Sequence, residues 1–469
     1  MPNLFRNTFY ISLTQGWQMI MALVLFKTAT VGLGESGFGV YTLAMTLMYF
    51  VLLFDDFGVT TLVTRDIARR PAESRPVLAG AMGLKLLLIP VSFAFLGVYT
   101  ALARPDSVTC RVIWIVAVYG ISSSFTQLVF AVFRGHERMQ YETLTVLVEK
   151  TLSTVLCVAA VRLRLGLVPF ALAFALAGAV SLGLSLLILR RRFHPADVRM
   201  DVRGSGRLFR DSLPFGLALF VTYSYGQLSV PILRQMRGDA AVGLYGAAQK
   251  LMSFTNLIPM IFATAFFPRL SAVSADREET SRVFTLGLKA LFMIAVPLVP
   301  GVLLTADRLI LLLADERYAA SSSALRVLAF AAALNFFNVF LASLYNAVNR
   351  QRLFLGFEAA ALAVNVAVNI ALISRFSFVG AAWATLITEA CMFLPAMGWA
   401  LARLVRITEW AVWPRALAAT GVMTLFLAAV PGLTVLAAVP AAAAVYAASL
   451  LAFRAVSLSE IRNQWAAFK

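Results

Sequence analysis

Residues 32–41 read GLGESGFGVY, and residues 236–245 read MRGDAAVGLY. The two stretches match one another at an offset of 204 residues, at polar and glycine positions alike. The matched pairs are Glu35 with Asp239, Gly39 with Gly243, and Tyr41 with Tyr245. Farther along the chain a second set of matches has an offset of 216 residues. In this set Ala131, Val132 and Arg134 recur as Ala347, Val348 and Arg350, Tyr141 and Glu142 as Phe357 and Glu358, and Glu149 and Ser153 as Asn365 and Asn369.

These constant offsets indicate two copies of one apolar unit that run in the same direction. Each copy holds six apolar segments. Membrane transporters are often built from such repeats, and the interface between the repeats carries the substrate path. The sequence therefore favours a transporter.

The composition supports this class. Apolar residues make up 61% of the 469-residue chain and charged residues 13%, and the mean hydropathy is +0.84. These values exclude an ordinary soluble protein. The net charge of +17 is better explained by membrane topology than by nucleic-acid binding, since basic residues of multi-pass proteins concentrate in cytoplasmic loops. We expect an all-α integral membrane protein without a nucleic-acid partner.

We predict about fourteen transmembrane helices, because apolar stretches of about 20 residues recur along the whole chain. They cover residues 8–31, 37–62, 78–101, 112–133, 143–161, 167–189, 212–233, 243–268, 284–305, 323–348, 354–374, 379–402, 411–430 and 434–453. A basic tract at 190–211 separates the repeats. We expect an N-terminal lobe at 1–211, a C-terminal lobe at 212–408, and two extra helices with a tail at 409–469. The arginine excess on one side predicts that both termini are cytoplasmic.

Charged residues inside the predicted spans are the first candidates for a functional site. Five of the six lysines fall there: Lys27, Lys85, Lys150, Lys250 and Lys289. A charge at mid-bilayer costs roughly 2.5–3.5 kcal/mol, so such residues usually face a cavity or a partner. Snorkelling toward a span end is the alternative for each lysine. Acids within spans are Asp55, Asp56, Glu149, Glu358 and Glu389. Their alternative role is structural neutralisation of a basic residue.

Two of these acids carry specific expectations. Glu389 is the acid nearest mid-membrane, where desolvation favours a carboxyl group that binds a proton or a cation. A fixed ion pair with a lysine such as Lys289 is its alternative. Glu149 and Lys150 are adjacent, and adjacent helical residues point about 100° apart. We therefore expect each of them to have its partner elsewhere.

Polar residues also form stripes at helical spacing. The stripes are Glu358, Asn365 and Asn369; Glu142, Glu149 and Ser153; Asn335, Asn338, Tyr345, Asn346 and Asn349; Gln249, Ser253, Asn256 and Thr264; and Thr8, Ser12 and Gln15. Hydrogen bonds between helices would explain one such stripe. Five stripes over both repeats favour a water-filled path.

Signals of catalysis are missing from the sequence. It has no P-loop, no G-x-S-x-G motif and no spacing typical of a metal site. The three cysteines are scattered and suggest no disulfide framework. We expect no enzyme, no cofactor and no metal.

Several motifs are similar to those of a known family. Arg6-Asn7, Gly32-Leu33-Gly34-x-x-Gly37-x-Gly39-x-Tyr41, Asp56-Phe57-Gly58 and Arg65-x-Ile67-Ala68-Arg69 resemble the opening of the Wzx-like polysaccharide flippases. That family belongs to the multidrug/oligosaccharidyl-lipid/polysaccharide superfamily. The second half resembles it in Ala241-Val242-Gly243-x-Tyr245, Phe267-Pro268-x-Leu270-Ser271 and Gly380-Ala381-Ala382-x-Ala384-Thr385.

The resemblance implies two six-helix lobes around a central cavity that opens alternately to each side of the cytoplasmic (inner) membrane. It implies a polyprenyl-pyrophosphate-linked oligosaccharide, such as an O-antigen precursor, as substrate. Contacts with a polysaccharide polymerase or glycosyltransferases are a further expectation. Two alternatives stay open within the superfamily. Lipid II flippases also have fourteen spans, whereas small-molecule drug/cation antiporters usually have twelve. An integral-membrane transferase would need a metal motif that the sequence lacks.

The expected mechanism assigns roles to the candidate residues. The five lysines suit a pyrophosphate group as point charges. Amide side chains suit sugar hydroxyls, and those expected in the cavity are Gln15, Gln249, Asn256, Asn335, Asn338 and Asn346. Buried acids such as Glu389 and Glu149 would couple transport to H⁺ or Na⁺. Asn365 and Asn369 would supply neutral oxygen ligands for Na⁺.

Overall fold

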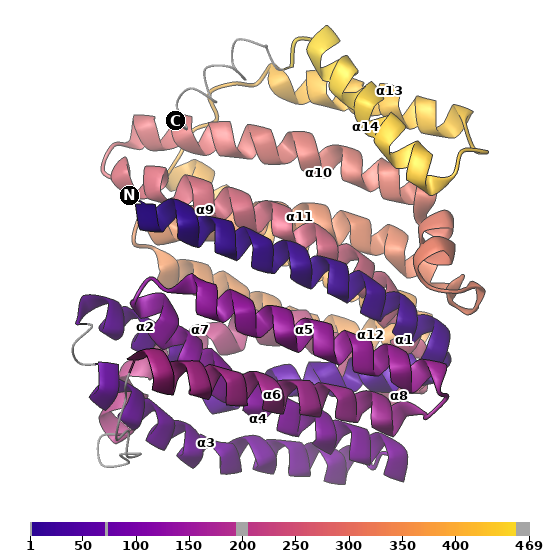
Figure 1. The fold of residues 1–469 in the computed structure, drawn as a ribbon. Coiled ribbons are helices and arrows are strands. Elements are labelled where there is room, and N and C mark those ends of the chain that lie inside the picture. Colours follow the sequence, from indigo (N-terminus) through magenta and orange to yellow (C-terminus); the bar gives the residue numbers. More distant parts are fainter. Residues whose placement is uncertain (1, 71–73, 194–204, 456–469) are drawn as a thin grey trace. The chain divides into compact units, whose positions relative to one another are not determined.

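The computed structural model describes residues 2–70, 74–193 and 205–455, and every regular element in these ranges is helical (Figure 1). The elements are α1 (Pro2–Asp56), α2 (Val59–Arg69), α3 (Ser74–Ala103), α4 (Ser107–Gly135), α5 (Met139–Arg162), α6 (Leu167–Phe193), α7 (Ser205–Gln227), α8 (Ser229–Ser253), η2 (Phe254–Asn256), α9 (Leu257–Ala272), α10 (Arg277–Leu313), η3 (Glu316–Tyr318), α11 (Ser321–Ala347), α12 (Gln351–Arg403), α13 (Val412–Ala429) and α14 (Val435–Ala452).

Eleven continuous helical stretches in the described ranges are long and apolar enough to cross a membrane. The prediction of an all-helical, multi-pass membrane protein is therefore confirmed. Three of these stretches, Arg6–Asp56, Ser205–Ala272 and Gln351–Arg403, contain 51, 68 and 53 residues. Since one span needs about 20 residues, each of the three is long enough for two crossings. The number of crossings stays a prediction.

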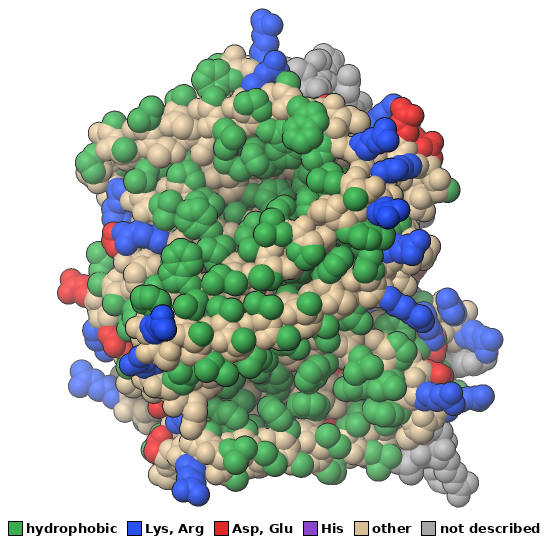
Figure 2. Space-filling model, turned by 180° about the vertical axis from the view of Figure 1, so that it is seen from behind, with side chains coloured by type: hydrophobic (Ala, Val, Ile, Leu, Met, Phe, Trp, Pro, Cys, Tyr) green, Lys and Arg blue, Asp and Glu red, His purple; other side chains and the backbone are tan. Residues whose placement is uncertain are grey.

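The surface of the helices is apolar, as contact with the hydrocarbon of a bilayer requires. Large apolar side chains are exposed along them, including Leu87 on α3, Leu425 on α13 and Leu436 on α14. In water such side chains would favour aggregation, whereas in hydrocarbon they are solvated. Figure 2 shows apolar side chains over the middle of the helices and lysine and arginine side chains near their ends.

The chain divides into two compact units, Met1–Gly243 (unit 1) and Leu244–Lys469 (unit 2). The boundary lies within α8, farther along the chain than the predicted lobe boundary after residue 211. Residues 212–243 belong to unit 1 because α7 packs against α1, α2 and α3. The predicted lobes at 1–211 and 212–408 stay a prediction.

Unit 1 is centred on α4, which packs against α1, α2 and α6, while α5 packs against α1 and α6. Its apolar core joins Val63 of α2, Leu84 of α3 and Phe130 of α4. Polar contacts fasten α1 to α5 as well: Thr14 Oγ1 donates a hydrogen bond to Thr143 Oγ1 at 2.9 Å. Helices that share lipid as solvent depend on such close packing and on interhelical hydrogen bonds.

Unit 2 is centred on α11, which packs against α9, α10 and α12. The pair α13 and α14 forms a small apolar core of its own and packs on α10. Tyr446 Oη donates a hydrogen bond to the Met293 carbonyl at 2.8 Å, and Arg308 donates to the Pro431 and Leu433 carbonyls. The two helices beyond the repeat are therefore fixed to their own unit by specific contacts.

The matched stretches at residues 32–41 and 236–245 each contain a glycine with non-helical backbone angles. Gly34 (φ 69°, ψ 178°) interrupts α1, and Gly238 (φ 80°, ψ −176°) interrupts α8 in nearly the same conformation. These residues are 204 positions apart. Only glycine adopts such angles readily, so each helix is broken at the same place in the matched sequence.

Just after these breaks, α1 and α8 cross in contact within unit 1. A Cβ atom added at Gly39 would lie 1.8 Å from the Asp239 carbonyl oxygen, and one added at Gly243 would lie 2.0 Å from the Glu35 carbonyl oxygen. The contact is thus reciprocal: the glycine of each copy meets the backbone carbonyl of the acidic residue of the other copy. No side chain fits at either glycine without moving a helix.

We predict that Gly39→Ala destabilises this crossing by about 1–3 kcal/mol, the usual cost of overpacking. Gly97→Ala on α3 is the matched control, because a Cβ there meets no atom within 4 Å. Thermal unfolding of the purified protein in detergent measures both effects. We expect a lower midpoint for Gly39→Ala and an unchanged or raised midpoint for Gly97→Ala, and equal midpoints would contradict the tight crossing.

Candidate functional site

Among the residues that the structure describes, three clusters of buried and half-buried polar side chains each lie inside a single unit. The Glu149 cluster in unit 1 consists of Tyr119, Glu149, Lys150 and Ser181. The Asp55 cluster, also in unit 1, consists of Asp55, Asp56, Lys85 and Ser124. The Glu389 cluster in unit 2 consists of Asn335, Asn338, Asn365, Asn369, Thr388 and Glu389.

The Glu149 carboxylate on α5 accepts hydrogen bonds from three helices. Oε1 accepts from Tyr119 Oη on α4 at 2.8 Å and from Lys150 Nζ at 2.8 Å, and Oε2 accepts from Ser181 Oγ on α6 at 2.9 Å. Lys150 Nζ also donates to Tyr119 Oη at 3.2 Å. Both carboxylate oxygens are occupied and the negative charge has a cation beside it. Such a saturated pair is suited to holding helices together.

The pairing of Glu149 with Lys150 contradicts the expectation from the helical wheel. The backbone directions of adjacent residues do diverge. However, the long Lys150 side chain curves back, and its ammonium group lies against the Tyr119 ring, 5.9 Å from the centroid. The flexible stem of lysine allows a geometry that residue spacing alone does not reveal.

The Glu389 carboxylate on α12 has a different environment. Oε1 accepts a hydrogen bond from Asn335 Nδ2 at 3.3 Å, and Oε2 accepts from Asn338 Nδ2 at 2.7 Å. Its exposed fraction is 5%. Among the described residues no lysine or arginine forms an ion pair with Glu389. A buried carboxylate with amide donors alone suits a bound proton or cation.

Carbonyl oxygens without hydrogen-bond partners belong to the same cluster. Asn365 Nδ2 donates to Thr388 Oγ1 at 3.0 Å, and Asn369 Nδ2 donates to Asn365 Oδ1 at 3.0 Å. The amide oxygens of Asn338 and Asn369 are buried and accept no hydrogen bond from described residues. Hard monovalent cations are bound by oxygen atoms of this kind, so the cluster has the chemistry of an ion site.

Lys289 does not neutralise Glu389. Its ammonium group is 3.1 Å from Glu409 Oε2, which follows the last turn of α12. The lysine is buried and the acid is exposed. The alternative of a fixed Lys289–Glu389 pair is therefore wrong. Lys289 instead pairs with Glu409. A substrate anion would have to compete with this carboxylate for the Lys289 ammonium group.

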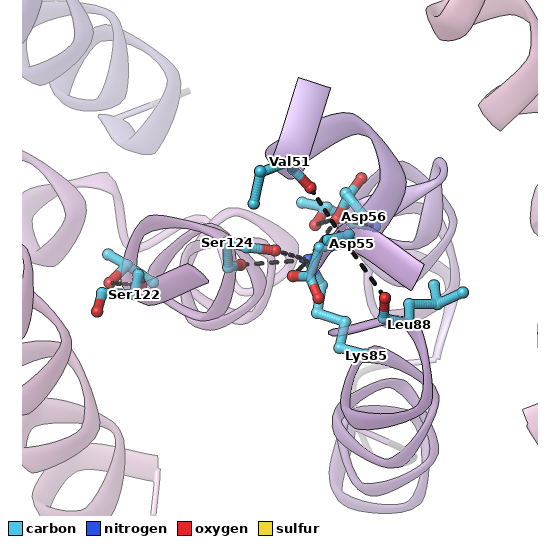
Figure 3. A network of polar contacts seen from close by, with 10 residues as sticks. Val51, Asp55, Asp56, Lys85, Leu88, Ser122 and Ser124 are labelled. Carbon is cyan, nitrogen blue, oxygen red and sulfur yellow. Dashed lines mark hydrogen bonds and ion pairs between the residues drawn. The ribbon is translucent and has the colours of Figure 1, made fainter. Parts of the chain in front are cut away.

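Lys85 also has its polar partners within its own unit, unit 1. Its side chain is fully buried, and Nζ is 2.7 Å from Asp56 Oδ1 and 2.5 Å from Ser124 Oγ (Figure 3). It also donates to the Ser124 carbonyl at 3.3 Å. Three ammonium hydrogens are thus engaged. A pyrophosphate group would have to displace these contacts to reach Lys85.

The other candidates lie nearer the surface. Lys27, Lys250, Asn256 and Asn346 are exposed, whereas Gln15, Gln249 and Asn335 are half-buried. Lys250 lies over the Phe254 ring, with Nζ 5.8 Å from the centroid. Lys27 and Lys250 are therefore more exposed than Lys85 and Lys289.

Sequence reasoning did not single out Tyr119, Ser181 and Thr388, which complete the clusters. A signal for Tyr119 does exist: it precedes Asn335 by 216 residues, the second repeat offset, and Glu149 precedes Asn365 by the same number. Matched positions therefore contribute to a polar cluster in each unit. The acid, however, lies on α5 in unit 1 and on α12 in unit 2.

Comparison with known proteins places these features in a family. A model of the family described as polysaccharide biosynthesis protein matches residues 4–274. A protein of Escherichia coli named "Putative O-antigen transporter" is 24% identical over 289 residues, which is 57% of this chain and 65% of that protein. The match thus spans less than two thirds of the E. coli protein. A protein of Haloferax volcanii named "Probable low-salt glycan biosynthesis flippase" is 24% identical over 367 residues, which is 76% of this chain and 75% of that protein.

Solved structures share the fold at low sequence identity. The lipid II flippase MurJ in an inward closed conformation has a TM-score of 0.76 at 12% identity, over 96% of this chain and 99% of that chain. An inward-facing MATE family multidrug transporter has a TM-score of 0.65 at 16% identity, over 84% and 98% of the two chains. The family model covers more than half of the sequence, and the fold is that of flippases and transporters. The chain therefore belongs to the polysaccharide biosynthesis protein family.

Proposed function

We propose that this protein is a flippase that moves a polyprenyl-pyrophosphate-linked oligosaccharide across the cytoplasmic membrane by alternating access. The observation that carries the proposal is membership of the polysaccharide biosynthesis protein family. The names of the relatives, an O-antigen transporter and a glycan biosynthesis flippase, support it. We infer no catalytic step.

The chemistry of the substrate explains why such a protein is needed. An isolated anion in a medium of low dielectric costs tens of kcal/mol, and an unpaired hydroxyl group adds several more. The polyprenyl tail, by contrast, is soluble in lipid. The protein therefore has to give the head group a wet, basic path while the tail stays in the bilayer.

We propose fourteen crossings with both termini in the cytoplasm. Three long helical stretches are interrupted at Gly34, Gly238 and Ser377. If each is counted as two crossings, the eleven stretches become fourteen. The matched breaks at Gly34 and Gly238 support two repeats that run in the same direction, with six crossings each, in lobes at 1–211 and 212–408. Residues 409–469 add the last two helices.

Two other substrates fit the fold, and sequence similarity separates them. The likeness to a lipid II flippase and to multidrug transporters is structural, at 12% and 16% identity. The family match and the relatives at 24% identity point to glycans. We therefore propose a lipid-linked oligosaccharide as the substrate, in preference to lipid II or small cationic drugs. Contact with the polymerase or glycosyltransferases that handle the same glycan is part of the proposal.

We predict that deleting the gene in its own host removes a surface polysaccharide and leaves its lipid-linked precursor in the membrane. Extraction of lipid-linked oligosaccharides and staining of surface glycan measure the two effects. Efflux of a cationic dye is the parallel assay. Intact surface glycan together with lost dye efflux would show that the protein is a drug antiporter instead.

We propose that Lys27 and Lys250 contact the pyrophosphate group, because both are exposed and lysine binds phosphates as a point charge. Lys150, Lys85 and Lys289 form ion pairs, and we propose that their main role is structural. The exposed Asn256 and Asn346 and the half-buried Gln15, Gln249 and Asn335 are proposed to bind sugar hydroxyls. Asn338 is buried, so a sugar would reach it only in another conformation.

Substituting the exposed lysines tests their role. We expect Lys250→Gln and Lys27→Gln each to reduce glycan export several-fold at unchanged protein level, since the pyrophosphate loses a cation. Lys250→Arg and Lys27→Arg are matched controls that keep the charge and should retain most export. Surface glycan and membrane protein level are measured in parallel. Full export by both glutamine variants would remove the lysines from the substrate path.

We propose that Glu389 couples transport to a cation gradient, with Asn365 and Asn369 as neighbouring oxygen ligands. The absence of an ion pair to Glu389 among described residues supports this role. Glu149 is the weaker candidate, because Lys150, Tyr119 and Ser181 satisfy both of its oxygens. A carboxyl group inside the membrane that lacks a fixed cation is typical of proton and ion relays.

We predict that Glu389→Gln folds normally, because an amide fits among the asparagines, yet loses the response of export to an imposed gradient. The measurement is glycan translocation in proteoliposomes with a pH or sodium gradient. Glu279→Gln at the partly exposed start of α10 is the control and should respond like the wild type. A wild-type response in Glu389→Gln would rule out the coupling role.

A further inference from the structure

The end of α1 contains a buried charge cluster to which the proposed transport function assigns no role. Asp55 and Asp56 are the last residues of α1, and the backbone then turns at Phe57 (φ 38°) and Gly58 (φ 82°) before α2 begins. Asp56 accepts hydrogen bonds from the backbone amide and the hydroxyl group of Thr60. The acid pair is therefore built into the break between two helices.

The break is packed tightly against α7. A Cβ atom added at Gly58 would lie 2.7 Å from Phe215 Cβ, and one added at Gly216 would lie 2.6 Å from the Phe57 carbonyl oxygen. The Phe57 ring also stacks on Phe209, with centroids 5.6 Å apart. A change in the charge of Asp55 and Asp56 would thus directly affect the packing of the α1–α2 break against α7.

The Lys85 ammonium group is the cation beside both carboxylates, but it lies closer to Asp56 than to Asp55. Figure 3 shows Lys85 reaching from α3 between Asp55, Asp56 and Ser124. Lys85 Nζ is 2.7 Å from Asp56 Oδ1 but 3.9 Å from Asp55 Oδ2. Its other donors go to Ser124 Oγ and the Ser124 carbonyl. Lys85 has no hydrogen atom left to donate to Asp55.

Asp55 is fully buried, and neither of its oxygens accepts a hydrogen bond from a described residue. The charged or titratable groups that act on the pair are Lys85 from α3 and, toward Asp56, Tyr223 from α7. The Ser124 hydroxyl group on α4 also faces Asp55, and its oxygen already accepts a hydrogen bond from Lys85. An ionised carboxylate without donors is one of the least favourable groups to bury.

The charge count indicates what is missing from the cluster. Two ionised carboxylates and one ammonium group leave a net charge of −1 in the interior. Neighbouring carboxyl groups relieve such repulsion when one of them keeps its proton. A sodium ion would instead have to sit beside the Lys85 ammonium group, which already uses both Ser124 oxygens. One proton completes the cluster with less repulsion.

We propose that Asp55 and Asp56 bind one exchangeable proton, carried mainly on Asp55, while Lys85 balances the charge of Asp56. The proton comes from water and returns to it past Asp56, whose side chain is 22% exposed. This site lies in unit 1 and is separate from the Glu389 cluster in unit 2. Loss of the proton leaves a buried net charge, which favours opening of the contact between the α1–α2 break and α7.

The first test compares two amide variants of the full-length protein in detergent. Asp55→Asn replaces a neutral acid with a neutral amide of the same shape, so we expect an unfolding midpoint equal to that of the wild type. Asp56→Asn takes away the ion partner of Lys85 and leaves a buried cation, so we expect a clearly lower midpoint. Equal losses in the two variants would overturn the proposal, because they would show that Asp55 is an ionised structural partner.

Infrared difference spectroscopy then detects the proton itself. Titrating wild-type protein toward high pH should remove a carbonyl band of a protonated carboxyl group, and ¹³C-aspartate labelling should shift this band. We expect the band to be absent from Asp55→Asn and present in Glu389→Gln. Labelled wild-type protein without a protonated aspartate band would overturn the proposal, even if a variant failed to fold. Neither measurement requires transport, so its outcome is independent of the glycan proposal.

Discussion

The structure depends on one constraint: a charge placed in hydrocarbon has to be compensated inside the helical unit that carries it. Lipid offers no hydrogen bonds, so each polar group needs a partner from a neighbouring helix. Glu149 meets the requirement fully, with Lys150, Tyr119 and Ser181 around it. Glu389 and Asp55 do not. The incompletely compensated acids are therefore the ones with room for a proton or a cation.

The two units solve this problem with different residues at matched positions. In unit 1, Tyr119 of α4 and Glu149 of α5 form a saturated pair with Lys150. The matched positions in unit 2, Asn335 and Asn365, are neutral, and the acid comes from α12 instead. A cluster that carries its own cation is rigid, whereas a cluster of amides around one acid can accept an ion. Matched positions of the sequence thus carry different polar residues in the two units.

Much of this could be read from the sequence, for physical reasons. Long apolar stretches predict helices, and the recurrence of Glu35, Gly39 and Tyr41 as Asp239, Gly243 and Tyr245 marks the glycines at the helix crossing. The buried positions of Asn338, Asn365 and Asn369 agree with polar stripes. However, their hydrogen bonds run between and within helices, which favours helix-to-helix bonding over a water-filled path at these three residues.

The remaining features depend on the reach of flexible side chains and on contacts between distant segments. Helical spacing separates Glu149 from Lys150, yet the lysine stem brings the charges together. The Lys289–Glu409 pair joins residues 120 positions apart, and no periodicity indicates it. The same holds for Lys85, whose partners lie at the end of α1 and in the middle of α4.

The central claim is that this chain itself moves a lipid-linked glycan across a bilayer. The most direct measurement reconstitutes the purified protein in liposomes that carry a polyprenyl-pyrophosphate-linked oligosaccharide on the inner leaflet only. A glycosidase that cannot cross the membrane then reports how fast the sugar reaches the outside. The account predicts rapid exposure of the sugar in liposomes that contain the protein and slow exposure in protein-free liposomes. Equal rates in the two, with correctly folded protein in the membrane, would contradict it.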